Sequence, residues 1–109
     1  MAAEVKTRVR IPAIIHKGDV IEVKTMVGHP MESGQRRDAA GNPVPRRIIH
    51  SMNVAYGGRE VFAGRFDSAI AANPYIAFFV RIDEAGTLDF IWKDDDGSTY
   101  KTSQAVVLA

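Results

Sequence analysis

The sequence predicts an all-β fold, namely an immunoglobulin-like antiparallel β-sandwich of about seven strands. Three observations predict it: apolar and polar residues alternate along most of the chain, turn sequences separate the alternating runs, and no long helical period occurs. At 109 residues, the chain is long enough for one hydrophobic core. Residues 1–109 are therefore expected to form a single domain.

Two alternating runs open the chain, and a turn at residues 17–19 joins them. Side chains two apart on a strand share a face, so each run is expected to bury one face and expose the other. The residues expected to face the core are Val5, Thr7, Val9 and Ile11 in the first run, and Ile21, Val23, Thr25 and Val27 in the second.

The next predicted strand covers residues 48–56, and a return strand covers about residues 60–66. Gly57 and Gly58 form the hairpin turn between them, since glycine takes positive φ without steric cost. The face expected to be apolar in the first of these strands carries Ile48, His50, Met52, Val54 and Tyr56.

Two further strands close the chain, over residues 87–93 and 98–108, with a hairpin turn at the Asp94–Gly97 run. Leu88, Phe90 and Trp92 are expected to face the core, with Phe78 beside them. A short stretch at residues 68–73 predicts one helical turn, which Pro74 ends.

The strand expected over residues 75–82 is apolar on both faces. Ile76, Phe78, Val80 and Ile82 form one face, and Tyr75, Ala77 and Phe79 form the other. Such a strand is either covered on its second face by the chain itself or capped by a partner. The sequence leaves both alternatives open.

Residues 28–47 form a long loop without strand or helical period. Most connections in compact domains run to about 4–6 residues, and much longer ones tend to be functional or disordered. The loop carries two arginine pairs, at positions 36–37 and 46–47, whose guanidinium groups could hold a small anion. More often, such arginines are solvated or paired with acids such as Glu32 and Asp38.

Composition excludes several classes of function. The net charge of +1 gives no overall attraction to nucleic acid, and the aromatic residues fall in strands rather than beside the basic loop. The absence of cysteine excludes disulfides, thiolate metal sites and a cysteine nucleophile in this chain. No signal peptide or membrane span is apparent, so the sequence alone predicts a cytoplasmic or co-exported protein.

Templates for catalysis are also missing. The chain has no G-x-S-x-G elbow, no glycine-rich phosphate loop and no zinc motif, so we expect neither an enzyme acting alone nor a cofactor. Asp94, Asp95 and Asp96 could bind a hard cation, but adjacent acids before a glycine are more typical of a solvated turn.

One alternative function is a periplasmic copper-binding sandwich. His29 with Met31, and His50 with Met52, form two H-x-M pairs, and imidazole and thioether ligands suit Cu(I). His50 and Met52 are better explained as core residues, because Ile48 and Val54 are expected on the same face.

The H-P-M sequence at the start of a long loop also resembles the superoxide reductase family, whose iron is held by histidines and one cysteine. That family has a second histidine six residues after the first, where this chain has Gln35. The chain also lacks cysteine. The resemblance therefore implies a related fold without the iron chemistry.

A longer series of fragments resembles the SoxZ family, the smaller subunit of the SoxYZ carrier in bacterial thiosulfate oxidation. The resemblance runs from about residue 8 to the C-terminus. The matching residues are those of the 20–25 strand, His29-Pro30-Met31-Glu32, Gly34, Arg37, Asp38, Gly41, Pro45, Arg46, Ile48, Ile49, Gly58, Glu60, Val61, Phe62, Ala72-Asn73-Pro74-Tyr75, Asp94-Asp95-Asp96-Gly97-Ser98 and Tyr100.

This resemblance implies a non-catalytic subunit of a heterodimer. Its SoxY-like partner would carry the sulfur intermediate on a cysteine in a glycine-rich C-terminal arm and present it to successive pathway enzymes. It also implies a periplasmic location, reached by export with a signal-bearing partner. The candidate partner-binding residues are Phe79 and Tyr75 on the doubly apolar strand, and Arg36, Arg37, His29 and Glu32 on the loop.

Overall fold

The computed structural model describes residues 5–67 and 72–109, and within them every regular element is a β-strand. The strands are β1 (Lys6–Arg10), β2 (Asp19–Gly28), β3 (Ile49–Tyr56), β4 (Arg59–Arg65), β5 (Tyr75–Ile82), β6 (Gly86–Asp94) and β7 (Thr99–Val106). The predicted all-β class is thus confirmed. The helical turn predicted at 68–73 falls largely outside the described residues.

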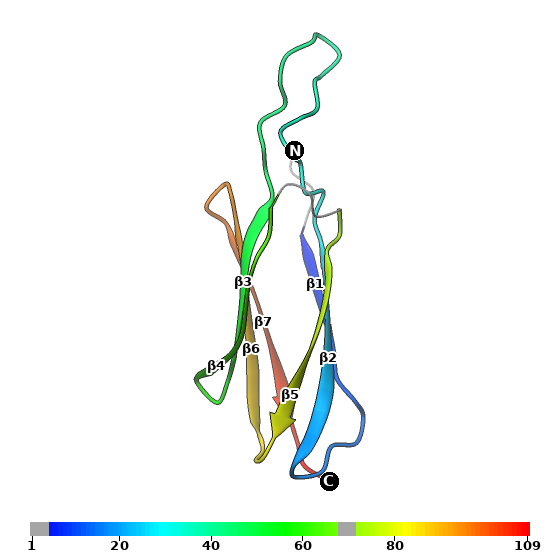
Figure 1. The fold of residues 1–109 in the computed structure, drawn as a ribbon, viewed down its shortest axis with the longest axis vertical. Helices are drawn as coiled ribbons and strands as arrows, with labels where there is room; N and C mark the ends of the chain where they lie inside the picture. The colour runs from blue at the N-terminus through cyan, green and yellow to red at the C-terminus, as the bar shows by residue number, and fades with distance from the viewer. Residues whose placement is uncertain (1–4, 68–71) are drawn as a thin grey trace.

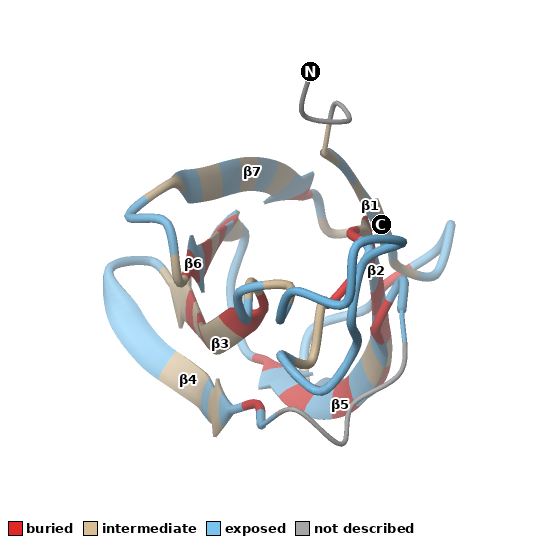
Figure 2. Cartoon of the chain, turned by 90° about the horizontal axis from the view of Figure 1, so that it is seen from above, coloured by how far each residue is buried: buried red, intermediate tan, exposed pale blue. Residues whose placement is uncertain are grey.

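The strands form two antiparallel sheets that face each other (Figures 1 and 2). One sheet has three strands in the order β1-β2-β5, and the other has four in the order β4-β3-β6-β7. This is the immunoglobulin-like sandwich that the alternating sequence predicts. Among the described residues, no helix is long and apolar enough to cross a membrane.

The core lies between the sheets and is built from the alternating positions. Trp92, Phe90 and Phe78 are buried there, as predicted, and burying such large aromatic groups contributes strongly to stability. The inward residues of β2 are buried as predicted: Ile21, Val23, Thr25 and Val27. Period-two alternation therefore identifies the buried face correctly in both sheets.

Contacts between the sheets close both open sides of the sandwich. On one side, the hydroxyl groups of Thr7 in β1 and Thr102 in β7 are hydrogen-bonded. On the other side, the rings of Phe62 in β4 and Phe78 in β5 stack with their centroids 4.6 Å apart. These contacts join the two sheets along both sides of the core.

The prediction of which β3 residues face the core is wrong at the start of the strand. An irregularity between Ile49 and Ser51 adds one residue to β3 opposite β6. Because a bulge shifts the alternation by one residue, Ile49 is fully buried and His50 is only half-buried. Met52 and Val54 resume the expected pattern and are buried.

The hairpin between β3 and β4 has the predicted turn. Gly57 and Gly58 have φ angles of 59° and 83°, in the left-handed region that glycine adopts without strain. The turn places β4 antiparallel to β3 at one edge of the four-stranded sheet.

Candidate functional site

The long loop is a paired projection rather than an irregular coil. It leaves the sandwich beyond the end of β2 and returns to the start of β3, standing clear of both sheets (Figure 1). Near its base, the backbone groups of Glu32 and Arg47 exchange two hydrogen bonds of 2.8 Å. Farther out, the amide of Val44 donates to the carbonyl of Arg36 at 2.9 Å. The two arms of the loop therefore support each other.

Asp38 organises the tip of the loop. Its Oδ1 atom accepts hydrogen bonds from the amides of Ala40 and Asn42, at 3.0 and 2.9 Å. The guanidinium of Arg37 donates to the carbonyl of Gly41 at 2.9 Å. These side-chain bonds replace the backbone pairing that a turn leaves incomplete.

His29 anchors the base of the loop and is fully buried. Its Nδ1 atom accepts a hydrogen bond of 2.9 Å from the amide of Met31. A nitrogen that accepts carries no proton, so the proton of the neutral ring lies on Nε2. That atom lies 2.7 Å from Oδ2 of Asp94 and donates to it. Both ring nitrogens of His29 are therefore occupied by structural bonds.

Asp94 is the buried acceptor of this network, at 2% exposure. Its Oδ2 atom also accepts from the hydroxyl of Tyr100 at 2.8 Å, and its Oδ1 atom accepts from the amide of Asp96 at 3.2 Å. Burial alone would raise the pKa of Asp94, but the bonds from Tyr100, His29 and Asp96 outweigh it and lower the pKa. The carboxylate is thus held ionised inside the protein.

Burial has the opposite outcome for Tyr100. Loss of solvent, together with its hydrogen bond to the ionised Asp94, raises the pKa of Tyr100. The phenol therefore keeps its proton and remains a donor to Asp94.

The acidic turn between β6 and β7 supplies counter-ions to the loop. Arg46 forms a forked pair with Asp95, with N–O distances of 2.8 and 3.0 Å. Arg47 lies 3.1 Å from Asp96 and 3.5 Å from Asp94. The expected solvated turn is wrong for Asp94, which is buried, because residues from the distant loop cover it.

The remaining loop arginines are also engaged. Arg36 pairs with Glu32 at 2.7 Å, as the sequence suggested, and this acid raises the pKa of Arg36. Arg37 holds the Gly41 carbonyl. All four loop arginines have protein partners, so they do not form an open anion site.

Most residues of the copper alternative have other roles in the fold. The ring nitrogens of His29 are occupied, and the sulfur of Met31 accepts a hydrogen bond of 3.3 Å from the amide of Ile49. Met52 lies in the core, whereas the bulge turns His50 away from it. Within residues 5–67 and 72–109, no three histidine or acidic side chains group as metal ligands.

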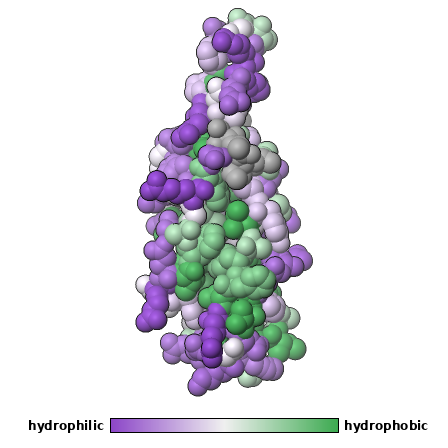
Figure 3. All heavy atoms as spheres, viewed as in Figure 1, coloured by the Kyte–Doolittle hydropathy of each residue, from purple (hydrophilic) through white to green (hydrophobic). Residues whose placement is uncertain are grey.

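Phe79 and Tyr75 lie on the outer face of the three-stranded sheet. They are 67% and 56% exposed, so the alternative that the chain itself covers this face is wrong. On the neighbouring strand β2, Val20 and Met26 are 64% and 37% exposed. Figure 3 looks onto the side of the sandwich where β5 lies nearest the four-stranded sheet, and apolar atoms gather there. We call Val20, Met26, Tyr75 and Phe79 the apolar band.

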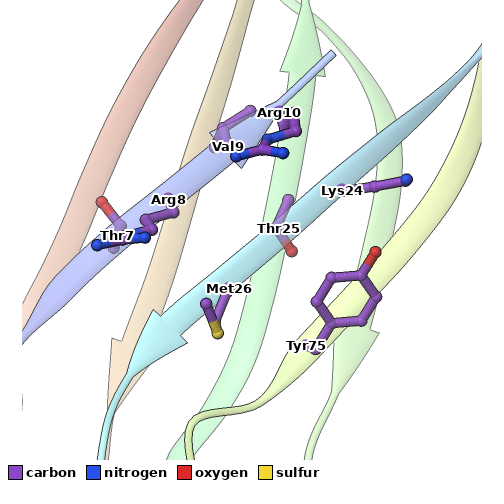
Figure 4. A pocket seen from close by; sticks show the side chains of 8 residues that line it. All are labelled: Thr7, Arg8, Val9, Arg10, Lys24, Thr25, Met26 and Tyr75. Carbon is purple, nitrogen blue, oxygen red and sulfur yellow. The ribbon is translucent and has the colours of Figure 1, made fainter. Parts of the chain in front are cut away.

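Charged side chains lie beside and between the residues of the apolar band. A groove of about 570 Å³ runs across β1 and β2, and Arg8, Arg10 and Lys24 line it together with Met26 and Tyr75 (Figure 4). Tyr75 and Met26 occupy opposite positions in the β2–β5 register, which brings their side chains together. On the same face, Glu22 lies opposite Phe79, Arg81 lies opposite Val20, and Glu22 pairs with Lys24 at 3.6 Å. The outer face therefore alternates exposed apolar groups with charged ones.

Sequence reasoning found Phe79 and Tyr75 from the doubly apolar strand but missed Val20 and Met26. Their signal was present, since both alternate with the buried residues of β2. It also missed the role of Asp94 and Tyr100 in holding the loop. Of the candidate loop residues, His29 is buried at the base, whereas Arg36 and Arg37 lie exposed farther out.

Comparisons with solved structures show the fold. A superoxide reductase (neelaredoxin) from Ignicoccus hospitalis matches with a TM-score of 0.71 and 16% identity, covering 94% of this chain and 80% of that one. The sulfur carrier protein SoxY from Chlorobium limicola matches with a TM-score of 0.63 and 13% identity, covering 94% and 78%. At such identities, the likeness concerns the fold alone. No curated protein matches the chain significantly.

The family comparison is specific. The model of the sulphur oxidation protein SoxZ matches residues 9–105, nearly the whole chain. Several of the residues that carry the resemblance, among them His29, Arg46, Asp94, Asp95 and Tyr100, meet in the structure where the loop joins the sandwich. The chain therefore belongs to the SoxZ family, whose members serve sulfur oxidation as the non-catalytic subunit that pairs with a SoxY-type partner.

Proposed function

We propose that this chain holds its SoxY-type partner through the outer face of the three-stranded sheet and presents the bound sulfur intermediate to pathway enzymes through the long loop. The observation that carries the proposal is the exposed apolar band. Phe79, at 67% exposure, projects from the middle of a strand rather than from a mobile turn.

Burial energetics support a partner on this face. Removing a large apolar side chain from water contributes about 1.5–3 kcal/mol when burial is complete. Phe79, Tyr75 and Val20 are each more than half exposed. In the isolated chain, these side chains therefore contribute little of this burial free energy, and a partner that covers them would gain it. Aromatic side chains such as those of Phe79 and Tyr75 are enriched at protein interfaces.

The construction of the loop suits a second, transient contact. Its base is fixed by the buried His29–Asp94 pair, and its arms are joined by backbone hydrogen bonds. The molecule measures 57 × 23 × 21 Å, and the loop extends it along the longest axis (Figure 1). A projection of this kind, carrying Arg36 and Arg37, can reach a successive enzyme while the sheet face stays on the partner.

The proposal extends to location and domain organisation. We place the protein in the periplasm, exported together with a signal-bearing partner, and its cysteine-free sequence is compatible with an oxidising compartment. We also treat residues 1–109 as one domain, since the buried residues of both sheets form one continuous core.

The first experiment is affinity capture of the tagged chain from the periplasm of cells grown on thiosulfate, followed by mass spectrometry. We expect one stoichiometric partner with a cysteine in a glycine-rich C-terminal tail. Recovery of the chain alone would contradict the heterodimer. A Cu(I) titration in parallel tests the copper alternative, which would require tight stoichiometric binding that a His29→Ala variant loses.

A further inference from the structure

We infer that a second groove, on the outer face of the four-stranded sheet, binds a small tetrahedral oxyanion of sulfur: sulfate, thiosulfate or a sulfonate end group. The groove measures about 860 Å³ and lies beside the base of the long loop. It is separate from the apolar band, which lies on the other sheet. Its lining includes Arg46, His50, Ser51, Arg65, Lys93 and Asp95.

The register of three strands places two cations around one hydroxyl. Ser51 in β3 lies opposite Arg65 in β4 on one side and opposite Lys93 in β6 on the other. Neighbouring strands are about 4.8 Å apart, so the two cationic residues stand about 10 Å apart with the small serine between them. An oxyanion above Ser51 could therefore contact both cations and the hydroxyl.

These groups are available for a ligand. In the described part of the chain, neither Arg65 nor Lys93 makes an ion pair or hydrogen bond through its side chain, and the Ser51 hydroxyl is unbonded. Among the described residues that line the groove, the one carboxylate is that of Asp95, and Arg46 holds it. Because Arg46 and Asp95 neutralise each other, the excess positive charge of the described lining residues comes from two cations, Arg65 and Lys93.

Small side chains at the bottom of the groove make it concave. Ala63 lies opposite Asn53 in the next row, and the Asn53 amide is held by Glu60 at 3.3 Å. Small side chains at Ser51 and Ala63 leave the hollow that the surrounding longer side chains enclose. The β3 bulge adds His50 to the lining, where its ring is half-buried and outside the core.

The exposure of the cations sets the expected affinity. Exposed ion pairs contribute little, so a free anion should bind with a Kd on the order of 1 mM. A sulfonate attached to a docked partner would gain from an effective concentration that also reaches the millimolar range. The choice of a sulfur oxyanion rests on the proposed function; the groove itself indicates only a small anion.

The test follows backbone amide shifts by NMR during titration with sulfate and thiosulfate, at constant ionic strength balanced with chloride. We expect saturable shifts centred on Ser51. Arg65→Gln combined with Lys93→Gln should raise Kd about tenfold. The matched control, Arg59→Gln with Lys101→Gln, removes the same charge from exposed positions of the same sheet and should change Kd less than twofold.

A Ser51→Leu variant separates a shaped site from general electrostatic attraction, because it fills the floor and keeps every charge. Loss of saturable binding supports the site, and unchanged binding overturns it. Equal weakening by the control pair, or shifts that never saturate, would also overturn it. Tighter binding of S-sulfocysteine than of sulfate would assign the site to a sulfonate carried on a cysteine, and equal binding would assign it to the free ion.

The same variants also distinguish this inference from the proposed function. Partner capture measured with Ser51→Leu should be unchanged, since Ser51 lies on the sheet opposite the apolar band. Failure of anion binding with intact pairing would remove only the oxyanion site. Failure of pairing in the unaltered chain would remove the carrier role.

Discussion

The Nε2 atom of His29 lies 2.7 Å from Oδ2 of Asp94, and both side chains are fully enclosed. The two residues are separated by 65 positions in the sequence, one just beyond β2 and the other at the end of β6. Their bond therefore ties one sheet to the other at the point where the long loop leaves the sandwich. A loop that must present itself to other proteins gains a fixed base from this contact.

Replacing His29 with alanine should lower the free energy of unfolding by about 3 kcal/mol, because the buried Asp94 carboxylate loses the shortest of its hydrogen bonds and a cavity is left beside it. It also removes the acceptor of the Met31 amide. Urea denaturation of both proteins measures the difference. His50→Ala is the control, with an expected change below about 0.5 kcal/mol, since His50 lies outside the core. Equal effects of the two substitutions would refute the anchoring role of His29.

Stability should fall in acid through Asp94, whose folded-state pKa is lowered. Above the unfolded value of about 3.9, both states are ionised and the stabilisation is fully present. As the pH falls below that value, the unfolded state takes up the proton first, and the stabilisation is lost toward the folded pKa. Urea denaturation between about pH 6 and pH 3 measures this slope.

An Asp94→Asn variant tests the assignment of that acid dependence. It should be less stable at neutral pH, and its stability should decline less steeply below about pH 4 than that of the unaltered protein. Asp83→Asn serves as the control, because Asp83 forms only a surface pair with Arg81. An unchanged acid slope in Asp94→Asn would assign the dependence to other groups.

The sequence predicted the fold well where alternation alone decides burial. In β2 and β6, every second residue faces the core, so the buried face can be read directly from the period of two. The start of β3 could not be read this way, because its bulge depends on pairing with β6, which is distant in the sequence. Ile49 was therefore expected on the wrong face.

In the candidate site too, local sequence patterns predicted some features, whereas others depend on tertiary contacts. The apolar outer face of β5 identified Phe79 and Tyr75 because the second face of one strand is a local property. Burial of Asp94 depends on His29 and Tyr100, which only the tertiary structure brings to it. A run of three aspartates before a glycine has the composition of an exposed turn, and nothing local marks one of them as buried.

Replacing Phe79 with serine should weaken partner binding by about 10- to 100-fold, as expected for an aromatic residue at the centre of an interface. Folding stability should change by less than about 0.5 kcal/mol, since the ring is 67% exposed in the isolated chain. Binding to the captured partner can be measured by calorimetry. Ile14→Ser is a matched control, because Ile14 is 69% exposed but lies outside the apolar band. Unchanged pairing in folded Phe79→Ser would refute this interface.

Gly34→Ala should loosen the loop more than Gly41→Ala. Both glycines have positive φ, 85° and 83°, so each substitution carries a backbone cost of about 1–2 kcal/mol. A Cβ atom at position 34 would also lie 3.0 Å from the Cβ of Arg46, whereas position 41 has open space. Hydrogen exchange of the Glu32 amide, which pairs with Arg47, should therefore accelerate more in Gly34→Ala. Equal acceleration would mean that the contact with Arg46 does not hold the two arms together.

Charge reversal of Arg36 and Arg37 to glutamate should separate the two proposed contacts of the molecule. Both arginines are exposed on the projecting loop, away from the apolar band, so pairing with the SoxY-type partner should change less than twofold. Docking of the assembled pair to a downstream enzyme should weaken by about tenfold or more, because reversal replaces attraction with repulsion and each charge mostly affects association rate. Surface plasmon resonance at low salt measures both affinities on the same preparation. The control reverses Arg59, an exposed arginine on β4 at the hairpin opposite the loop, and should leave docking unchanged. Equal loss of pairing and docking would contradict the division of roles between sheet and loop.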